Sequence, residues 1–220
     1  MSQEHHLQLN PKKTLFYWVV AILLSGLAQL FFRPSVRGRE NIPLTGPVLV
    51  APIHRSNLDF AFTLFMSRRK VFFMAKDSLF RVPVLGGALI QLGAFPVTRG
   101  QADREAMRSA EEVLNAGHAL IMFPEGTRKF GPDVEPLHAG VMFIAARTRA
   151  MVVPVGIAGT DRALPDGAKI PRPVKVRVVV GTALAPPNHE GRTSRSAVTA
   201  KTEELRRALE ATYHESLGLR

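Results

Sequence analysis

Short apolar runs alternate with longer segments of helical pattern along most of this 220-residue chain. A chain that alternates strands with helices favours a largely parallel or mixed sheet whose faces are covered by the helices. We therefore expect an α/β fold with a mixed, mostly parallel sheet flanked by helices. The strands are predicted at residues 47–52, 71–75, 94–97, 119–123, 151–157 and 174–180, and the helices at 58–66, 82–92, 102–116, 138–149 and 194–217.

Two stretches carry strong turn or edge signals. Residues 158–173 are rich in glycine and proline, which are typical of turns, so we expect a surface loop there. Pro154 lies inside the strand-like run 151–157, where a proline usually marks an edge strand or a bulge. Such an edge or bulge nearly suffices to explain Pro154 without any functional role.

The first apolar segment, residues 14–32, has no charged side chain. As a helix it would be about 28 Å long, close to the ~30 Å hydrocarbon core of a membrane, and Tyr17 and Trp18 near one end suit a membrane interface. A signal peptide would need a small-residue cleavage site, which the following FFRPSVRG does not supply, and a buried core helix would need protein on all its faces. We predict a membrane-associated segment over residues 1–33 and a separate domain over residues 34–220. Whether the helix spans the membrane or lies in one leaflet stays open, and the basic residues at both of its ends give no clean orientation.

Composition narrows the partners and the chemistry. Lys and Arg number 29 against 18 Asp and Glu, so the net charge is +11, which indicates an anionic partner: nucleic acid, anionic lipid or a phosphorylated substrate. The basic residues are spread along the chain and no nucleic-acid motif accompanies them, so we expect no nucleic-acid partner. Cysteine is absent, which excludes disulfides, cysteine metal sites and a cysteine nucleophile. The histidines show no spacing typical of metal ligands, so no metal site is predicted.

A histidine and an aspartate five positions apart follow the strand predicted at 47–52. An aspartate that accepts from one ring nitrogen of His54 would leave the other nitrogen available as a base near neutral pH, and Asp59 is placed for this. Residues at the carboxyl ends of strands gather at the active sites of α/β sheets, which favours the position. The alternative is structural: Ser56 or Asn57 caps the next helix and Asp59 is an acid in its first turn.

A second motif, Phe-Pro-Glu-Gly-Thr-Arg at 123–128, begins at the last residue of the strand predicted at 119–123 and carries three polar side chains. Gly126 would let the backbone approach a ligand closely, Thr127 offers a hydroxyl, and the planar fork of Arg128 suits a phosphate. The alternative is a strand-exit turn with solvated charges, which proline and glycine make plausible.

Two further cations stand at predicted strand ends. Arg99 closes the segment 93–99, and Lys76 follows the strand predicted at 71–75. Lys76 would face the same edge of the sheet as the two motifs, because the carboxyl ends of parallel strands lie together. The alternative is a solvated strand end for Lys76 and an ordinary edge strand with a surface arginine for Arg99.

The order and spacing of four segments resemble the glycerolipid acyltransferase family, which includes the bacterial 1-acylglycerol-3-phosphate acyltransferases. The family's N-H-x-S-x-x-D motif is matched by residues 53–59, its Arg-ending motif by 93–99, its F-P-E-G-T-R motif in full by 123–128, and its proline-containing apolar run by 151–155. The resemblance covers about residues 34–185. Two departures stand out: Ile53 replaces the motif's Asn, and Ala139-Gly140 replaces a Lys-Gly pair, with His138 beside it.

The resemblance implies transfer of a fatty acyl group from acyl-CoA or acyl carrier protein to the sn-2 hydroxyl of lysophosphatidic acid, giving phosphatidic acid. Residues 34–220 would then be the acyltransferase domain, with His54 as general base and Asp59 as its orienting partner. No cofactor is implied beyond the acyl thioester co-substrate, and no metal. An acceptor of another kind, such as a different lysophospholipid, a glycolipid or an aminolipid, is the alternative within the family.

The same resemblance suggests which residues bind the substrate. Arg128 is the leading candidate for the phosphate, with Gly126 and Thr127 shaping the pocket, and Arg99 and Lys76 are further candidates. Glu125 is expected to hold Arg128 or to bind the glycerol hydroxyl, unless it forms a structural ion pair.

The expected partners are all anionic or apolar. They are the lysophospholipid, the acyl thioester, acyl carrier protein and an anionic membrane surface, where each nearby Lys or Arg adds about 1 kcal/mol of attraction. The active site would then face the cytoplasm. Candidate membrane contacts are Arg33, Arg37, Arg39 and residues 68–70, although a solvated basic surface would show the same pattern. A non-catalytic membrane-binding module is the alternative of another class, in which His54 and Asp59 would be dispensable.

Overall fold

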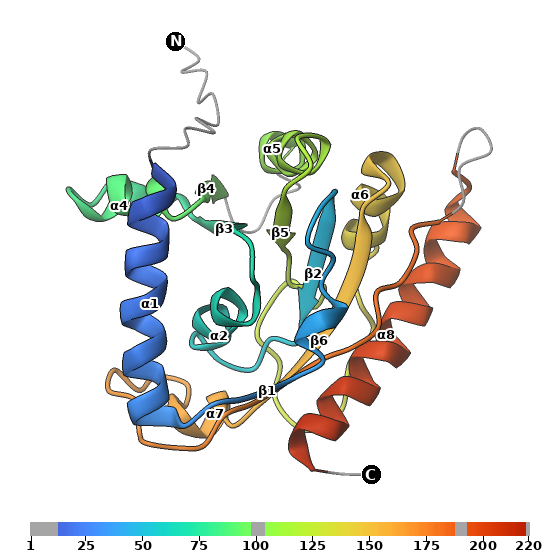
Figure 1. Ribbon diagram of the computed structural model, residues 1–220. Helices are drawn as coiled ribbons and strands as arrows, with labels where there is room; N and C mark the ends of the chain where they lie inside the picture. Colours follow the sequence, from blue (N-terminus) through green and yellow to red (C-terminus); the bar gives the residue numbers. More distant parts are fainter. Residues whose placement is uncertain (1–12, 98–103, 188–192, 219–220) are drawn as a thin grey trace.

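A computed structural model of the chain describes residues 13–97, 104–187 and 193–218 (Figure 1). The described residues form one seven-stranded sheet in which all neighbours are parallel except β6 and β7, which confirms the predicted mixed, mostly parallel sheet. The strand order is β1 (Ser35–Arg37), β7 (Arg177–Val180), β6 (Met151–Ala158), β2 (Val48–Pro52), β5 (Ala119–Ile121), β3 (Val71–Lys76) and β4 (Ala94–Val97).

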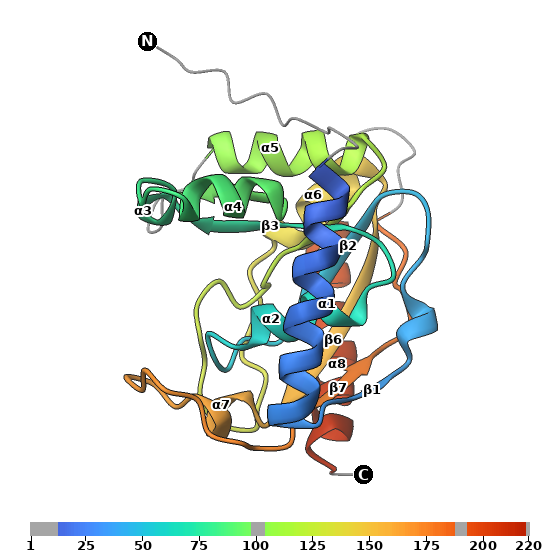
Figure 2. The same cartoon turned by 60° about the vertical axis from the view of Figure 1, so that its left-hand side comes forward.

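Helices cover both faces of the sheet, as Figures 1 and 2 show. Alternate residues of β2 point to opposite faces, so Val50 packs in a cluster with Phe62, whereas Leu49 packs in a second cluster with Leu114 and Ile144. The helices are α1 (Lys13–Phe32), α2 (Asp59–Met66), α3 (Asp77–Phe80), α4 (Leu85–Gln91), α5 (Arg104–Asn115), α6 (Gly140–Thr148), α7 (Thr160–Ala163) and α8 (Arg195–Leu217), with the 3-10 turn η1 at Arg39–Asn41.

The segment 158–173 is the predicted surface loop only in its second part, residues 165–173, which are irregular and mostly exposed. Its first part is the short helix α7, in which Thr160 and Ala163 are completely buried. Gly159, which precedes the helix, has a φ of +96°, and a Cβ on it would lie 2.5 Å from the carbonyl oxygen of Lys175. The glycine signal was therefore correct for a sharp turn, but the turn directs the chain into the core instead of over the surface.

The edge position suggested by Pro154 is also wrong, because β6 lies between β7 and β2. Antiparallel pairing with β7 ends at Val155 opposite Val180. Pro154 lies opposite Gly181, the residue that directly follows β7, and Gly181 donates its N–H to the Pro154 carbonyl. The antiparallel register shifts by one residue between Val155 opposite Val180 and Val152 opposite Leu184, so the bulge suggested by Pro154 is present here.

Helix α1 is buried on one side only. Tyr17 is almost fully buried and its hydroxyl accepts a hydrogen bond from the Val71 N–H at 3.3 Å, while Phe32 contacts the ring of Phe62 edge-on at 5.5 Å. A buried core helix is thus ruled out by the opposite side, where apolar side chains are exposed in a stripe that we call the α1 stripe: Val19, Ile22, Leu23, Leu27 and Leu30. In the part of the chain that the structure describes, no helix is long and apolar enough to cross a membrane. Association of residues 1–33 with a membrane, and their separation from residues 34–220, stay predictions.

Two of the arginines expected to face a membrane use their guanidinium groups inside the protein. Arg39 donates to the carbonyl of Met66, and Arg69 donates to the carbonyls of three loop residues, Pro43, Gly46 and Gly117. These contacts tie together loops at the amino-terminal edge of the sheet. Burial, together with the positive charges of Arg69 and Lys70, lowers the pKa of the neighbouring His118, which therefore stays neutral at neutral pH.

Candidate active site

The strand order brings three chain segments together at one edge of the sheet. Strand β2 lies between β5 and β6 and is parallel to both, so the residues after β2 lie between those after β5 and those after β6. In Figure 2 the loop that follows β5 and the helix α7 that follows β6 lie on the same side of the molecule as the start of α2. The site candidates His54, Glu125 and Thr160 belong to these three segments.

The predicted pair of His54 and Asp59 is in contact. The Nδ1 atom of His54 lies 3.1 Å from Oδ2 of Asp59, and the same oxygen accepts the N–H groups of Arg55 at 2.6 Å and Ser56 at 2.7 Å. The other oxygen, Oδ1, accepts the hydroxyl of Thr160 at 2.5 Å, and Asp59 is completely buried. Because an ionised carboxylate only accepts, His54 carries its proton on Nδ1 in this pairing, which leaves Nε2 available as a base.

The structural alternative for Asp59 holds only in part. Asp59 is indeed in the first turn of α2, and no side chain caps that helix. Its carboxylate, however, bonds the turn of residues 54–56. Ser56 is also buried: its hydroxyl donates to the Leu164 carbonyl at 3.0 Å and accepts the Leu58 N–H.

The segment after β5 holds His54 from three directions. The His54 ring stacks on Phe123 with 4.1 Å between ring centroids, its N–H donates to Oε2 of Glu125 at 2.8 Å, and its carbonyl accepts the N–H of Lys129 at 2.9 Å. The His54 side chain is still 15% exposed, so a substrate can reach it.

Glu125 pairs with Arg55, and this corrects the expectation that it holds Arg128. Nη1 of Arg55 lies 2.8 and 2.9 Å from the two carboxylate oxygens, and both side chains are buried. The structural ion pair is therefore present, and binding of a glycerol hydroxyl by Glu125 stays a prediction. Arg55 itself was missed by the sequence reasoning, because a charged residue beside the histidine has no pattern of its own.

Arg55 links the first motif to the loop after β5 and to α8. Its other nitrogens donate to the carbonyls of Gly131 and Asp133, and its guanidinium lies 5.0 Å from the ring centre of Tyr213. Burial raises the pKa of Tyr213 despite the nearby positive charge of Arg55, so its hydroxyl stays protonated and donates to Gly131 at 3.4 Å. Both the loop and the C-terminal helix are thereby fixed to the histidine turn.

The rest of the 123–128 motif is closer to solvent. Gly126 has a φ of +69°, and a Cβ there would lie 2.8 Å from Cδ2 of His138, so only glycine fits without displacing that ring. Thr127 is exposed. Arg128 lies 2.5 Å from Asp166, which belongs to the segment after α7, and its side chain is 33% exposed. Arg128 is therefore an accessible cation whose charge a carboxylate partly offsets.

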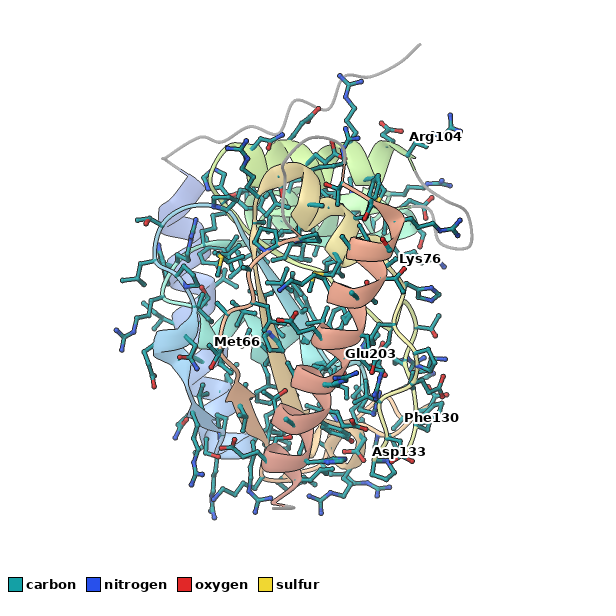
Figure 3. The ribbon with its side chains drawn as sticks, turned by 90° about the vertical axis from the view of Figure 1, so that its right-hand side faces the viewer. Met66, Lys76, Arg104, Phe130, Asp133 and Glu203 are labelled. Atoms are coloured by element: carbon teal, nitrogen blue, oxygen red, sulfur yellow. The ribbon has the colours of Figure 1, made fainter. Side chains whose placement is uncertain are left out.

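The two other cation candidates are Lys76 and Arg99. Lys76 is the exposed last residue of β3, two strands from β2, and in Figure 3 it lies on the same side of the molecule as Phe130 and Asp133 of the loop after β5. Arg99 lies outside the described residues. Within the described ranges, no group of three or more His, Asp and Glu side chains could hold a metal ion.

An apolar groove of about 350 Å³ opens beside the site, between α1 and α2. Leu27, Phe31 and Phe32 line it from α1, and Leu58 and Phe62 from the other side. Leu58 directly precedes Asp59 in the chain, so the groove begins next to the histidine turn. Its lining is almost wholly apolar, as a hydrocarbon chain would require.

The family model described as Acyltransferase matches residues 33–158, more than half of the chain. The chain belongs to this acyltransferase family. Its relatives include 1-acyl-sn-glycerol-3-phosphate acyltransferases: the chloroplastic LPAT1 of Arabidopsis thaliana (28% identical, 79% of this chain and 50% of the relative covered), that of Chlamydomonas reinhardtii (32%, 72% and 48%) and that of Bacillus subtilis (28%, 78% and 83%).

Among solved structures, the chain is similar to the 1-acyl-sn-glycerophosphate acyltransferase PlsC from Thermotoga maritima. The TM-score is 0.74 at 26% sequence identity, with 97% of this chain and 86% of that chain covered. This member of the acyltransferase family thus has the α/β fold of that protein. It spans about half the length of its plant and algal relatives.

The buried pair of Arg55 and Glu125 yields a stability prediction. The Arg55→Met variant should lose about 3–5 kcal/mol of unfolding free energy, because the Glu125 carboxylate would stay buried without its cation. Adding Glu125→Gln should restore part of the loss, since position 125 then carries no unpaired buried charge and the amide oxygen can still accept the His54 N–H. Urea denaturation measures both. The control is Glu135→Gln, which removes the more exposed Lys129–Glu135 pair and should cost at most about 1 kcal/mol. Equal losses for Arg55→Met and the control would contradict the prediction.

Proposed function

We propose that this protein is a lysophosphatidic acid acyltransferase, which transfers a fatty acyl group from acyl-CoA or acyl carrier protein to the sn-2 hydroxyl of lysophosphatidic acid. The observation that carries the proposal is the buried Asp59 that holds Nδ1 of a partly exposed His54. This geometry suits a base, and it occurs in an acyltransferase chain whose relatives include named 1-acyl-sn-glycerol-3-phosphate acyltransferases.

The reaction needs a base because an alcohol is not ionised at neutral pH. Nε2 of His54 takes the proton of the acceptor hydroxyl as its oxygen attacks the thioester carbonyl and forms the new C–O bond. Asp59 stabilises the imidazolium that results. The tetrahedral intermediate then breaks its C–S bond, and the departing thiolate takes the proton from His54, so the base returns to its starting state. The chain has no cysteine and Ser56 is buried, which favours direct transfer without an acyl-enzyme.

The phosphate of the acceptor is proposed to bind at Arg128. This guanidinium is partly exposed and follows the segment that holds His54, so a phosphate there would stay close to the base. Asp166 occupies Arg128 in the structure and would have to yield or share it. Gly126 and Thr127 are proposed to shape the approach to the phosphate, and Lys76 and Arg99 remain proposed phosphate contacts.

The groove between α1 and α2 is proposed to take a hydrocarbon chain of a substrate, because it is apolar and begins beside Asp59. The α1 stripe is proposed to bind the membrane from which such a substrate comes. Exposed apolar side chains of this number on one helix face are unusual for a protein surface that meets only water. The active site would then draw lipid from the adjacent leaflet, which we place at the cytoplasmic face.

Acceptor specificity is tested by thiol release. The protein has no cysteine, so a thiol reagent reports only the CoA set free. Purified protein with acyl-CoA should release thiol when lysophosphatidic acid is present and not with lysophosphatidylcholine, a lysoglycolipid or a lysine-containing lipid. The His54→Ala variant should lose about 10²–10⁴ in rate. The control is His118→Gln at the opposite edge of the sheet, which should keep its activity. Acylation of another acceptor alone would assign a different substrate to the protein. An active His54→Ala variant would show that His54 is not the general base.

The Arg128→Gln variant should raise the KM for lysophosphatidic acid about 10- to 100-fold, because a charge-assisted contact to the phosphate is lost. The KM for acyl-CoA should not change. The Asp166→Asn variant is the matched counterpart: it removes the carboxylate that competes for Arg128, so the KM for the acceptor should fall. A rise confined to the KM of the donor in Arg128→Gln would place this arginine at the thioester instead.

Membrane binding is tested with vesicles of phosphatidylcholine and phosphatidylglycerol. Replacing both Ile22 and Leu23 by Glu should lower the partition coefficient between vesicles and water at least tenfold. The reason is that burying each of these apolar side chains in lipid contributes about 1.5–3 kcal/mol. The control is Phe143→Glu. Phe143 is an exposed apolar residue of α6, the helix that packs on the other face of the sheet. Equal binding of the stripe variant and the unaltered protein would show that the α1 stripe is not the contact.

A further inference from the structure

Thr160 joins the candidate site from a segment that no motif marks. It is the first residue of α7 and follows β6, just beyond the residues that the family model matches. Since β6 is the parallel neighbour of β2, Thr160 arrives beside the turn that follows β2. The Gly159 turn, with its φ of +96°, directs the threonine inward, and its side chain is completely buried.

The hydroxyl of Thr160 bonds the oxygen of Asp59 that His54 does not use. Its Oγ1 donates to Oδ1 at 2.5 Å, whereas His54 and the N–H groups of Arg55 and Ser56 all bond Oδ2. The hydrogen must lie on the threonine, because the carboxylate only accepts. The two oxygens are therefore held separately, one by the turn of residues 54–56 and one by α7.

Holding both oxygens determines the orientation of the carboxylate plane. The terminal torsion of an aspartate is broad and roughly two-fold, so donors on one oxygen leave the plane partly free to rotate. A bond on the second oxygen removes that freedom and keeps Oδ2 directed at Nδ1 of His54. A second contact supports the arrangement: the Ser56 hydroxyl donates to the carbonyl of Leu164, at the end of α7.

We propose that Thr160 is a positioning residue, which acts through Asp59 to keep His54 in the tautomer that leaves Nε2 available as a base. The Thr160 hydroxyl bonds Asp59 and not His54, and its complete burial separates it from the surface that a substrate would approach. The catalytic part of this inference rests on the proposed acyltransferase function, whereas the effect on the tautomer of His54 does not.

The test compares Thr160→Val, which keeps the shape and removes the hydroxyl, with Thr160→Ser, which keeps the hydroxyl. In the thiol-release assay, Thr160→Val should lower kcat about 10- to 100-fold with both KM values within twofold, and Thr160→Ser should restore most of the rate. The matched control is Thr148→Val, a buried threonine whose hydroxyl bonds the Ile144 carbonyl in its own helix, and its kcat should not change. If Thr160→Val does not fold, Thr160→Ala takes its place, because it cannot clash.

Nitrogen-15 NMR of the histidine rings gives a readout that needs no turnover. The unaltered protein should show His54 as the Nδ1–H tautomer, and Thr160→Val should show a mixture of both tautomers. A kcat within twofold of normal, KM values that rise in step with the loss of kcat, or an unchanged tautomer in Thr160→Val would each overturn the proposal. If the unaltered protein transfers no acyl group, the proposed function fails, and the tautomer measurement still decides the role of Thr160.

Discussion

The parallel pairing of β2 with both β5 and β6 is the constraint on which the site depends. Strands that run the same way end at the same edge, so three loops far apart in the chain converge around residues 54–59. Each neighbour brings one partner: the segment after β5 brings Glu125, and the segment after β6 brings Thr160. In an antiparallel arrangement, one of these segments would leave from the opposite edge and its side chain could not reach the histidine turn.

The convergence also explains how ionised groups can be buried so densely. Removing Asp59, Glu125 and Arg55 from water is costly unless their hydrogen-bonding capacity is met. Here Asp59 accepts from four donors, Glu125 takes Arg55 and a backbone N–H, and Arg55 also reaches two loop carbonyls. Such a network tolerates little rearrangement, because moving one member leaves another buried without a partner. A rigid surround would suit the proposed base, which must meet two substrates in one orientation.

Much of the sheet could be predicted from local patterns, since strands β2 to β6 lie within two residues of their expected ends. The patterns failed where a distant contact decided the conformation. Residues 158–173 look like an exposed loop because Gly and Pro favour turns, and residues 165–173 are one, yet Thr160 and Ala163 are completely buried. Arg69 looks like part of a basic surface, yet it bonds three loop carbonyls that only the folded chain brings together. The edge strand β1 is three residues long, too short for any period to show.

The sequence by itself determined the fold class, the family and the pairing of His54 with Asp59, because each depends on residues close together in the chain or on an ordered set of motifs. Tertiary structure alone decided how the charges are shared. Glu125 lies three residues from Arg128 in the chain, but it pairs with Arg55, 70 residues away, while Arg128 pairs with Asp166. Thr160 reaches Asp59 across 101 residues. Such partners are chosen by strand order, because parallel neighbours deliver their loops to one edge whatever their separation in the chain.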